Sequence, residues 1–397
     1  MTAGWSTIAY EERPWKLPDG VPIPRRRRIA HAGPYLAAVP AHISGVTNLE
    51  VSTDILALAE EASTEIARFD AEIGHDLAPF SALLLRSESA ASSQIENLTA
   101  SAKAIALAEL GDPSKQNAKV IVANTRSMEA ALRLADALDE KAIIDMHAAL
   151  LGDTHPEWVG HWRREQVWIR GSNYGPHGAM FIPPHDDRVS ELMTDLVEFL
   201  RRDDLPVLAQ AAIAHAQFET IHPFPDGNGR TGRSLVHAML RSKGLTQTVT
   251  VPVSAGLLTD VDSYFGALSA YREGDPGAIV ERMADAAFPA IDNGRTLVGD
   301  LRAIRASWDD RVTARRNSVA WRILDVLTRQ PVIDSTLMQQ QLSSSAPSVN
   351  SAIEHLVEVE VLTKVGGQSR NRKWAAREVL EVLDAFATRA GRRAKNA

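Results

Sequence analysis

The chain has 397 residues, with 43 basic and 50 acidic side chains and a formal net charge of −7. Hydrophobic residues make up 45% and charged residues 23% of it, which is ordinary for a globular protein of two or three domains. The absence of cysteine excludes disulfides, thiolate nucleophiles and cysteine-based zinc sites. With no recognisable signal peptide and no apolar run of transmembrane length, we expect a cytoplasmic protein without a membrane partner.

The predicted elements are mostly helical. Residues 1–48 are rich in proline and glycine and are expected to form an arm that packs on the rest; the run Arg25–Arg28 lies in it. From Thr53, apolar residues recur at helical spacing as far as Phe69. The same spacing predicts further helices at 79–110, 115–138, 141–151, 187–201, 206–221, 229–244, 260–271 and 278–317.

One segment interrupts the helical pattern. Residues 165–184 read EQVWIRGSNYGPHGAMFIPP, with aromatic and β-branched residues on both sides of a glycine-rich tip. This composition predicts a β-hairpin with a wide turn.

The composition changes again near Asn317. Three short predicted helices and a glycine-tipped hairpin follow, which indicates a winged helix-turn-helix of about 60 residues. The candidate recognition helix, 348–356, carries Glu354, and Glu358 follows it. The wing is basic, with Arg370, Arg372 and Lys373. Because an acidic recognition helix opposes phosphate contacts, we favour a packing or protein-contact module and leave nucleic-acid binding open.

The stretch HPFPDGNGRTGR, residues 222–233, contains one histidine, one aspartate, two arginines and three glycines, which makes it the strongest candidate for a functional site. The helix before it must stop at His222, because the residue before a proline disfavours the α region. Gly227 and Gly229 permit backbone angles that are closed to other residues, and a new helix is predicted from about Gly229. A loop that leads into a helix N-terminus presents free N–H groups and a favourable dipole to an anion.

Charged side chains complete this stretch. Arg230 and Arg233 are three residues apart and lie on one face of the new helix, where both reach the same anion. Asp226 is suited to hold Mg²⁺ beside phosphates, and His222 is suited to act as a general base. A phosphate cradle, a metal ligand and a base together predict phosphoryl or nucleotidyl transfer to a hydroxyl.

The stretch resembles the signature of the Fic family, His-x-Phe-x-Asp/Glu-Gly-Asn-Gly-Arg-x-x-Arg, at every defined position. The resemblance implies AMP transfer from ATP to a Ser, Thr or Tyr hydroxyl of a protein target, which could be the chain itself. It also implies that the hairpin at about 167–182 is a flap that holds the target segment. The roles that it assigns are base for His222, Mg²⁺ ligand for Asp226, anion hole for Gly227, Asn228 and Gly229, phosphate contacts for Arg230 and Arg233, and buried anchor for Phe224.

Three other residues are weaker candidates. Tyr264 is placed to line an adenine pocket, although a core tyrosine fits equally well. His215 is expected to have a structural or supporting role, since it lies seven residues before His222 in the same helix. His147 shows no spacing with acids that would suggest zinc.

Many Fic proteins carry a short inhibitory helix with the pattern Ser/Thr-x-x-x-Glu-Gly/Asn. The sequence SSQIEN supplies Ser92, Glu96 and Asn97, and its glutamate would pair with Arg233 in place of the γ-phosphate. SAYREG, residues 269–274, fits the same pattern with Glu273. We favour Glu96, because its segment precedes the core as in proteins of the same layout.

The sequence therefore predicts a mostly α protein. We expect an arm and helices that include the inhibitory helix at 1–110, a Fic-fold helical core with a β-hairpin flap at 111–317, and a winged helix-turn-helix that is dispensable for folding of the core at 318–397. The predicted activity is that of a protein adenylyltransferase that uses ATP and Mg²⁺ and is inhibited by Glu96. Removal of AMP from a modified protein and a nucleotide-sensing DNA-binding regulator are the alternatives, and a homodimer is left open.

Overall fold

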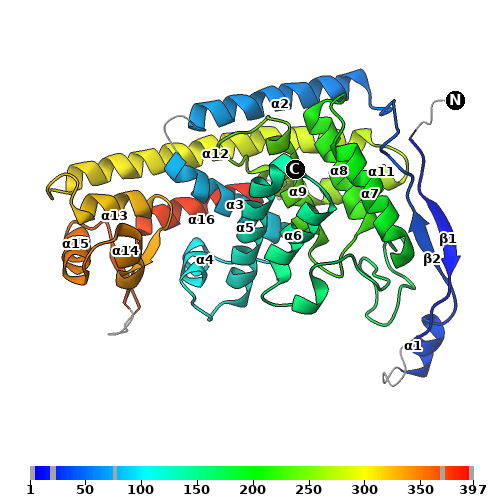
Figure 1. Ribbon diagram of the computed structural model, residues 1–397, viewed down its shortest axis with the longest axis horizontal. Coiled ribbons are helices and arrows are strands. Elements are labelled where there is room, and N and C mark those ends of the chain that lie inside the picture. The colour runs from blue at the N-terminus through cyan, green and yellow to red at the C-terminus, as the bar shows by residue number, and fades with distance from the viewer. Residues whose placement is uncertain (1–4, 18–23, 75–77, 367–371, 393–397) are drawn as a thin grey trace. The chain divides into compact units, whose positions relative to one another are not determined.

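The computed structural model describes residues 5–17, 24–74, 78–366 and 372–392. These residues are mostly helical, as predicted (Figure 1). They divide into two compact units that alternate along the chain. The first comprises 1–63, 127–244 and 262–284, and the second comprises 64–126, 245–261 and 285–397. Three of the boundaries between the units fall inside helices α2 (Thr53–Gly74), α5 (Gln116–Leu134) and α12 (Gly277–Arg311).

Among the described residues, the other regular elements of the first unit are two strands, six helices and three short 3-10 turns. They are β1 (Ala9–Arg13), α1 (Arg25–Ala30), β2 (Tyr35–Val39), η1 (Ala135–Ala137), α6 (Glu140–Leu151), η2 (Pro156–Trp158), η3 (Asp186–Arg188), α7 (Val189–Leu200), α8 (Val207–Ile221), α9 (Asn228–Ser242) and α11 (Val261–Arg272).

The first unit is built around α8. Every residue from Leu208 to Ile221 is buried, including polar side chains such as those of Gln210 and Gln217. Both α7 and α9 pack against it, and Figure 1 shows α8 and α9 side by side. The last turn of α8 and the first turn of α9 are therefore held in the same core.

The N-terminal arm packs on this unit. Strands β1 and β2 pair antiparallel with Ala9 opposite Val39, and the backbone nitrogen of Ala38 donates to the Ile182 carbonyl. The Asp195 carboxylate on α7 accepts hydrogen bonds from the backbone nitrogens of Ile43 and Ser44. The arm thus borders the segment that was predicted to be a hairpin.

That segment is less regular than predicted. Isolated antiparallel bridges join Ile169 to Phe181 and Ser172 to Gly175, and no continuous strand forms between 165 and 184. Positive φ angles at Arg170 and Gly171 break the pleat immediately after the first bridge. The segment follows the path of a hairpin, but it lacks the continuous antiparallel hydrogen bonding of one.

In the part of the second unit that the structure describes, there are eight further helices and turns and three short strands. They are α3 (Ala78–Ile95), α4 (Ala102–Glu109), α10 (Val253–Leu257), η4 (Leu258–Asp260), α13 (Val319–Leu327), β3 (Val332–Asp334), α14 (Ser335–Leu342), α15 (Ala346–Glu358), β4 (Thr363–Val365), β5 (Lys373–Ala375) and α16 (Arg377–Arg392). The strands form an antiparallel sheet in the order β3-β5-β4. The wing tip with Arg370 lies outside the described residues.

The single helix predicted at 79–110 is two helices, α3 and α4. Its apolar spacing continues across the break, but Asn97 adopts a left-handed conformation with φ of 61° and ends α3. Side-chain contacts then hold α3 inside the unit. The buried Glu88 carboxylate accepts hydrogen bonds from the backbone nitrogen (2.9 Å) and the hydroxyl (2.5 Å) of Ser254 at the start of α10.

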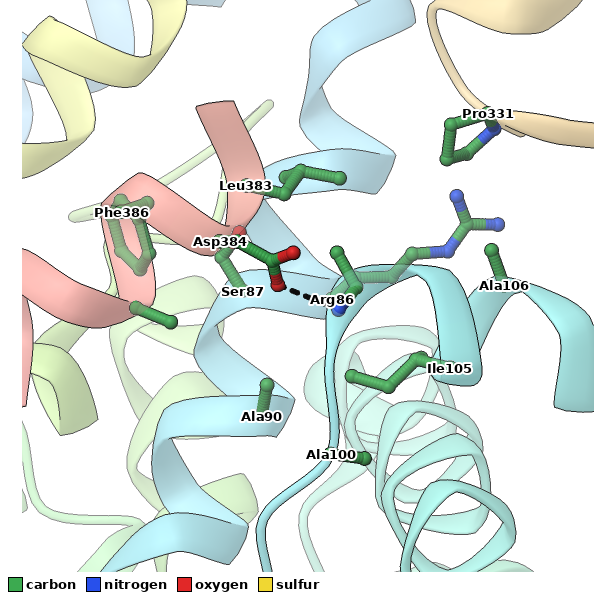
Figure 2. A pocket seen from close by; sticks show the side chains of 12 residues that line it. Arg86, Ser87, Ala90, Ala100, Ile105, Ala106, Pro331, Leu383, Asp384 and Phe386 are labelled. Carbon is green, nitrogen blue, oxygen red and sulfur yellow. Dashed lines mark hydrogen bonds between the residues drawn. The ribbon is translucent and has the colours of Figure 1, made fainter. Parts of the chain in front are cut away.

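Helix α16 packs against α3 and α4 in the same core. A cavity of about 50 Å³ lies among the three helices, and Figure 2 shows its lining of small apolar side chains together with Leu383 and Phe386 of α16. At its edge, the Asp384 carboxylate accepts a hydrogen bond of 2.8 Å from the backbone nitrogen of Ala102, the first residue of α4. Residues 318–397 therefore contribute to a core that also contains α3, and a chain ending at Asn317 would leave it open.

Within residues 5–17, 24–74, 78–366 and 372–392, no helix has both the length and the apolar character that a transmembrane span needs.

We expect Phe386→Ala to destabilise the protein by about 3–5 kcal/mol, because it enlarges an existing cavity in a core with little freedom to collapse. Phe386 is buried, whereas Val357 on α15 is exposed, so Val357→Ala is the matched control and should change stability by no more than about 0.5 kcal/mol. Urea denaturation measures the free energy of unfolding of both variants. Equal stability of Phe386→Ala and the parent chain would show that α16 is not part of this core.

Candidate active site

The candidate site lies in the first unit, where α8 ends and α9 begins. Helix α8 stops at Ile221, and its C-cap residue His222 is left-handed, with φ of 53° and ψ of 59°. Such a conformation costs a residue other than glycine about 1–3 kcal/mol. The surrounding contacts must therefore hold His222 in place.

The His222 side chain is a neutral base. Its Nδ1 lies 3.4 Å from the Glu219 carbonyl oxygen, which can only accept, so Nδ1 carries the proton and Nε2 is the basic nitrogen. No hydrogen-bond partner of Nε2 lies among the described residues. Burial, with a further contribution from the cation of Arg163, lowers the pKa of His222 to about 3. Since 19% of the side chain is exposed, the unprotonated ring can still meet a ligand.

The loop after His222 is closed by its own residues. The Asn228 side chain accepts a hydrogen bond from the backbone nitrogen of Phe224 and donates one to the Phe224 carbonyl, each at 2.9 Å. The Asn228 amide group is thus used inside the loop, and only its backbone N–H is left for the anion hole predicted from the sequence. Phe224 itself is fully buried, which agrees with its predicted role as an anchor.

Helix α6 forms the floor beneath this loop. The ring of His147 stacks on Phe224 at a centroid distance of 3.7 Å, and its Nε2 donates to the Asp226 carbonyl at 3.0 Å. Burial lowers the pKa of His147 to about 4, so it stays neutral and keeps this hydrogen bond at pH 7. Gly227 has φ of 79°, and a Cβ there would lie 2.9 Å from Leu150, so only glycine fits.

The start of α9 agrees closely with the prediction. The helix begins at Asn228, one residue before the expected position, and Gly227 is its N-cap. Gly229 was expected to use a special backbone angle, but it lies inside the first helical turn without positive φ. The expectation failed because one left-handed glycine is enough to turn the chain into the helix.

Two arginines follow on α9. Arg230 and Arg233 are each only 3% exposed, and Nη2 of Arg230 lies 3.3 Å from Oδ2 of Asp226. Buried guanidinium groups at the N-terminal end of a helix add their charge to the helix dipole. The arrangement favours an anion at the start of α9.

The residues present fit a Mg²⁺ ion that is bound together with phosphates. Within the described residues, no group of three or more His, Asp or Glu side chains could hold a metal ion by itself. Asp226 offers one carboxylate that is 55% exposed beside the anion-binding loop. Because Mg²⁺ is commonly bound by one or two carboxylates with phosphate oxygens and water, this single ligand suffices.

Sequence reasoning missed two arginines at the end of α8. Arg163 donates from Nε to the His222 carbonyl at 2.8 Å, and Arg272 on α11 donates from Nη2 to the Glu219 carbonyl at 3.4 Å. Neither has a local sequence signal. His147 could have been recognised as buried, because it shares an apolar helical face with Ile143 and Leu150.

The weaker candidates lie in the core. Tyr264 is 1% exposed, and its hydroxyl lies 2.7 Å from Nε2 of His215. Burial, followed by the charge of Arg233, lowers the pKa of His215 to about 3. Of the two interpretations of Tyr264, this environment favours the core tyrosine, and His215 fits its expected supporting role.

In the second unit, the candidate inhibitory segment forms the C-terminal end of α3. The backbone nitrogen of Leu98 donates to the Ser93 carbonyl at 3.0 Å and that of Asn97 donates to Gln94 at 2.9 Å, which together make a Schellman motif. Ser92 is fully buried, and Glu96 is the C-cap residue, so its side chain is presented at the helix end. The motif explains why the pattern requires Asn or Gly after the glutamate.

The rival match has the same local structure. At the end of α11, Asp275 donates to the Ala270 carbonyl at 2.9 Å and Gly274 donates to Tyr271 at 3.1 Å, with Gly274 at φ of 100°. Glu273 is again the C-cap residue, but it is exposed, whereas Glu96 is half-buried. The short pattern therefore identifies a type of helix end, and other observations must choose between the two glutamates.

Relatives of the chain are protein adenylyltransferases by name. A probable protein adenylyltransferase of Aquifex aeolicus is 36% identical over 128 residues, which cover 30% of this chain and 37% of that protein. A protein adenylyltransferase of Caenorhabditis elegans is 26% identical over 212 residues, or 49% of this chain and 38% of that protein. The matched regions thus span less than two fifths of each relative's length.

A solved structure has a similar fold. A Fic family protein of Desulfovibrio desulfuricans G20 aligns with 82% of this chain and 96% of its own, with a TM-score of 0.52 and 22% sequence identity. The Fic/DOC family model matches residues 137–240, which contain α6 to α8, most of α9 and the loop between His222 and Gly227. The chain carries a Fic/DOC family domain at residues 137–240.

Proposed function

We propose that the protein is an adenylyltransferase that moves AMP from ATP to a hydroxyl group of a protein side chain. The observation that carries the proposal is the set of groups between the end of α8 and the start of α9. The neutral imidazole of His222, with its Nε2 available, is followed by the glycine-capped N-terminus of α9, which carries two buried arginines. The names of the relatives support the same reaction class.

The chemistry follows from these groups. The target hydroxyl attacks the α-phosphorus of ATP and passes its proton to Nε2 of His222, while the bond between the α- and β-phosphates breaks and pyrophosphate leaves. Backbone N–H groups at the start of α9, with Arg230 and Arg233, neutralise charge on the departing phosphates. A Mg²⁺ held by Asp226 and phosphate oxygens would neutralise part of the same charge.

The finer assignments of the fold belong to this proposal as well. We assign residues 111–317 to the Fic core, and the segment 167–182 to a flap that aligns an extended target segment with His222. Helices α13 to α15 and the sheet β3-β5-β4 fit a winged helix-turn-helix. The acidic side chain of Glu354 on α15 supports a protein-contact role for this module.

The proposal includes autoinhibition by Glu96. Its carboxylate would pair with Arg233 and take the place of the γ-phosphate, so that ATP binds with misdirected phosphates. The half-buried position of Glu96 supports this role, because Glu273 ends its helix in the same Schellman motif but is exposed. The protein would then still bind ATP but transfer AMP slowly, because a misplacement of about 1 Å can cost roughly 100-fold in rate.

The first prediction concerns the base. His222→Ala should retain the fold and ATP affinity but lose AMP transfer by about 10²- to 10⁴-fold, the usual contribution of a general base. The measurement is the initial rate of label transfer from ATP to protein, with ATP affinity from calorimetry. His155→Ala is the control, because His155 lies outside the motif and is partly exposed. Transfer by His222→Ala at the parental rate would rule out this mechanism.

The second prediction concerns the inhibitor. Glu96→Gly should raise the rate of AMP transfer strongly at saturating ATP, and Glu273→Gly should not, although both glutamates cap helices of the same local structure. Adding Arg233→Ala to Glu96→Gly should abolish the gain, because the released arginine is the group that orients the γ-phosphate. Labelled ATP with cell lysate and purified protein measures the rate and reveals the target's mass.

The outcomes separate the candidates. Equal rates for the parent chain and Glu96→Gly would contradict autoinhibition by Glu96, and a gain from Glu273→Gly would assign it to α11. Release of AMP from a labelled protein without new transfer would favour the hydrolase alternative.

A further inference from the structure

The contacts at the end of α8 converge on one side chain outside the signature motif. Arg163 lies between η2 and the segment 165–184, and it is 2% exposed. No carboxylate among the described residues forms an ion pair with it. All of its side-chain hydrogen bonds go to backbone carbonyls: Nε to His222 (2.8 Å), Nη1 to Glu165 (2.9 Å), and Nη2 to Pro184 (2.5 Å) and Ile221 (3.4 Å).

We infer that Arg163 is the positioning residue of the catalytic base: it holds the backbone of His222 in its left-handed conformation and ties it to both ends of the segment that meets the target. This inference rests on the proposed function for its catalytic meaning. The contacts themselves belong to residues of one compact unit.

The first part of the inference concerns the backbone. The side chain of Arg163 binds the carbonyls of Ile221 and His222, and its backbone nitrogen donates to the Pro223 carbonyl at 2.9 Å. Three successive carbonyls thus take their donors from one residue. Because Ile221 and Pro223 are buried, bulk water does not replace these donors, and the left-handed turn at His222 depends on them.

The second part concerns the target segment. Glu165 and Pro184 are the first and last residues of the predicted hairpin, and both present their carbonyls to Arg163. Between them the segment has only isolated bridges, so its own ladder does not fix its base. The planar, multi-donor guanidinium therefore sets the distance between the ends of this segment and the backbone of His222.

The third part is electrostatic. The charged groups that face His222 are Glu219 on its own helix, Asp226 in the loop, Arg272 on α11 and Arg163. After burial, Arg163 contributes most to the lowered pKa of His222. Removing this cation should raise the pKa of the imidazole, whereas a structural role without proximity to the ring would leave it unchanged.

The test uses Arg163→Lys and Arg163→Met in the full-length chain, with and without Glu96→Gly. Lysine keeps the charge but cannot bridge several carbonyls as a planar fork does. Arg163→Lys should keep its fold and its ATP affinity within about threefold, yet lose roughly 100-fold in transfer rate, the effect of a small misplacement. Arg163→Met should raise the pKa of His222, followed by NMR titration of the imidazole, by about one pH unit.

Arg202→Lys is the matched control. Arg202 also donates to backbone carbonyls, those of Ser44 and Val46, but it pairs with Asp204 and contacts no residue of the motif. Its variant should transfer AMP at the parental rate and leave the His222 titration unchanged.

Several results would overturn the inference. Parental transfer rates in Arg163→Lys would show that the fork does not position the base, and an unchanged His222 titration in Arg163→Met would show that its charge does not reach the ring. If Arg163→Met fails to fold, Arg163→Lys still decides the question of positioning. If Glu96→Gly and the parent chain both lack transfer, the proposed function fails, while the titration still tests whether Arg163 acts on His222.

Discussion

The site depends on how a fully buried helix ends. The last carbonyls of any α-helix have no partner within the helix, and those of α8 lie where water cannot serve. Arginine donors from outside the helix satisfy them: Arg163 bonds to Ile221, and Arg272 bonds to Glu219. Cations are also favoured at this end of the helix dipole. The need to complete these hydrogen bonds thus brings positive charge next to His222 and keeps its imidazole neutral.

The short loop from His222 to Gly227 joins two opposite helix ends. The C-terminus of α8 carries partial negative charge, and the N-terminus of α9 carries partial positive charge. Two helix ends of opposite partial charge therefore follow each other within a few residues, before any side chain is considered. The side chains then strengthen this polarity, because Arg230 and Arg233 lie on α9 and the only acidic residue of the loop, Asp226, remains exposed. The hydrogen bonds between the Asn228 side chain and the backbone of Phe224 close the loop and hold the two helix ends together.

The sequence allowed the prediction of those features that neighbouring residues determine, such as the helix ends at the motif. The end of α8 at His222-Pro223 and the start of α9 beside Gly227 were predicted to within a residue, because proline and glycine act on neighbouring backbone. Contacts between distant segments could not be predicted. Arg163 precedes the motif by 59 residues, and its importance follows only from the carbonyls that it meets. The predicted hairpin does not form continuous strands. Its composition favours strands, but the backbone angles at Arg170 and Gly171 prevent them.

The inhibitory pattern shows how far a short motif can be trusted. Its final Asn or Gly is explained by a Schellman motif, and both matches in this chain form one, at Asn97 and at Gly274. What separates them is the support behind each glutamate. Helix α3 is held by the hydrogen bond from Ser254 on α10 to its Glu88 and by hydrogen bonds from Asn124 to Ser89 and Ser93, whereas Glu273 is exposed at the end of α11. A carboxylate on a fixed, half-buried helix end loses less conformational entropy when it pairs with an arginine than an exposed one does. Rigidity of the supporting helix, which the pattern does not encode, is therefore the physical reason why the proposed inhibitory role goes to Glu96 and not to Glu273.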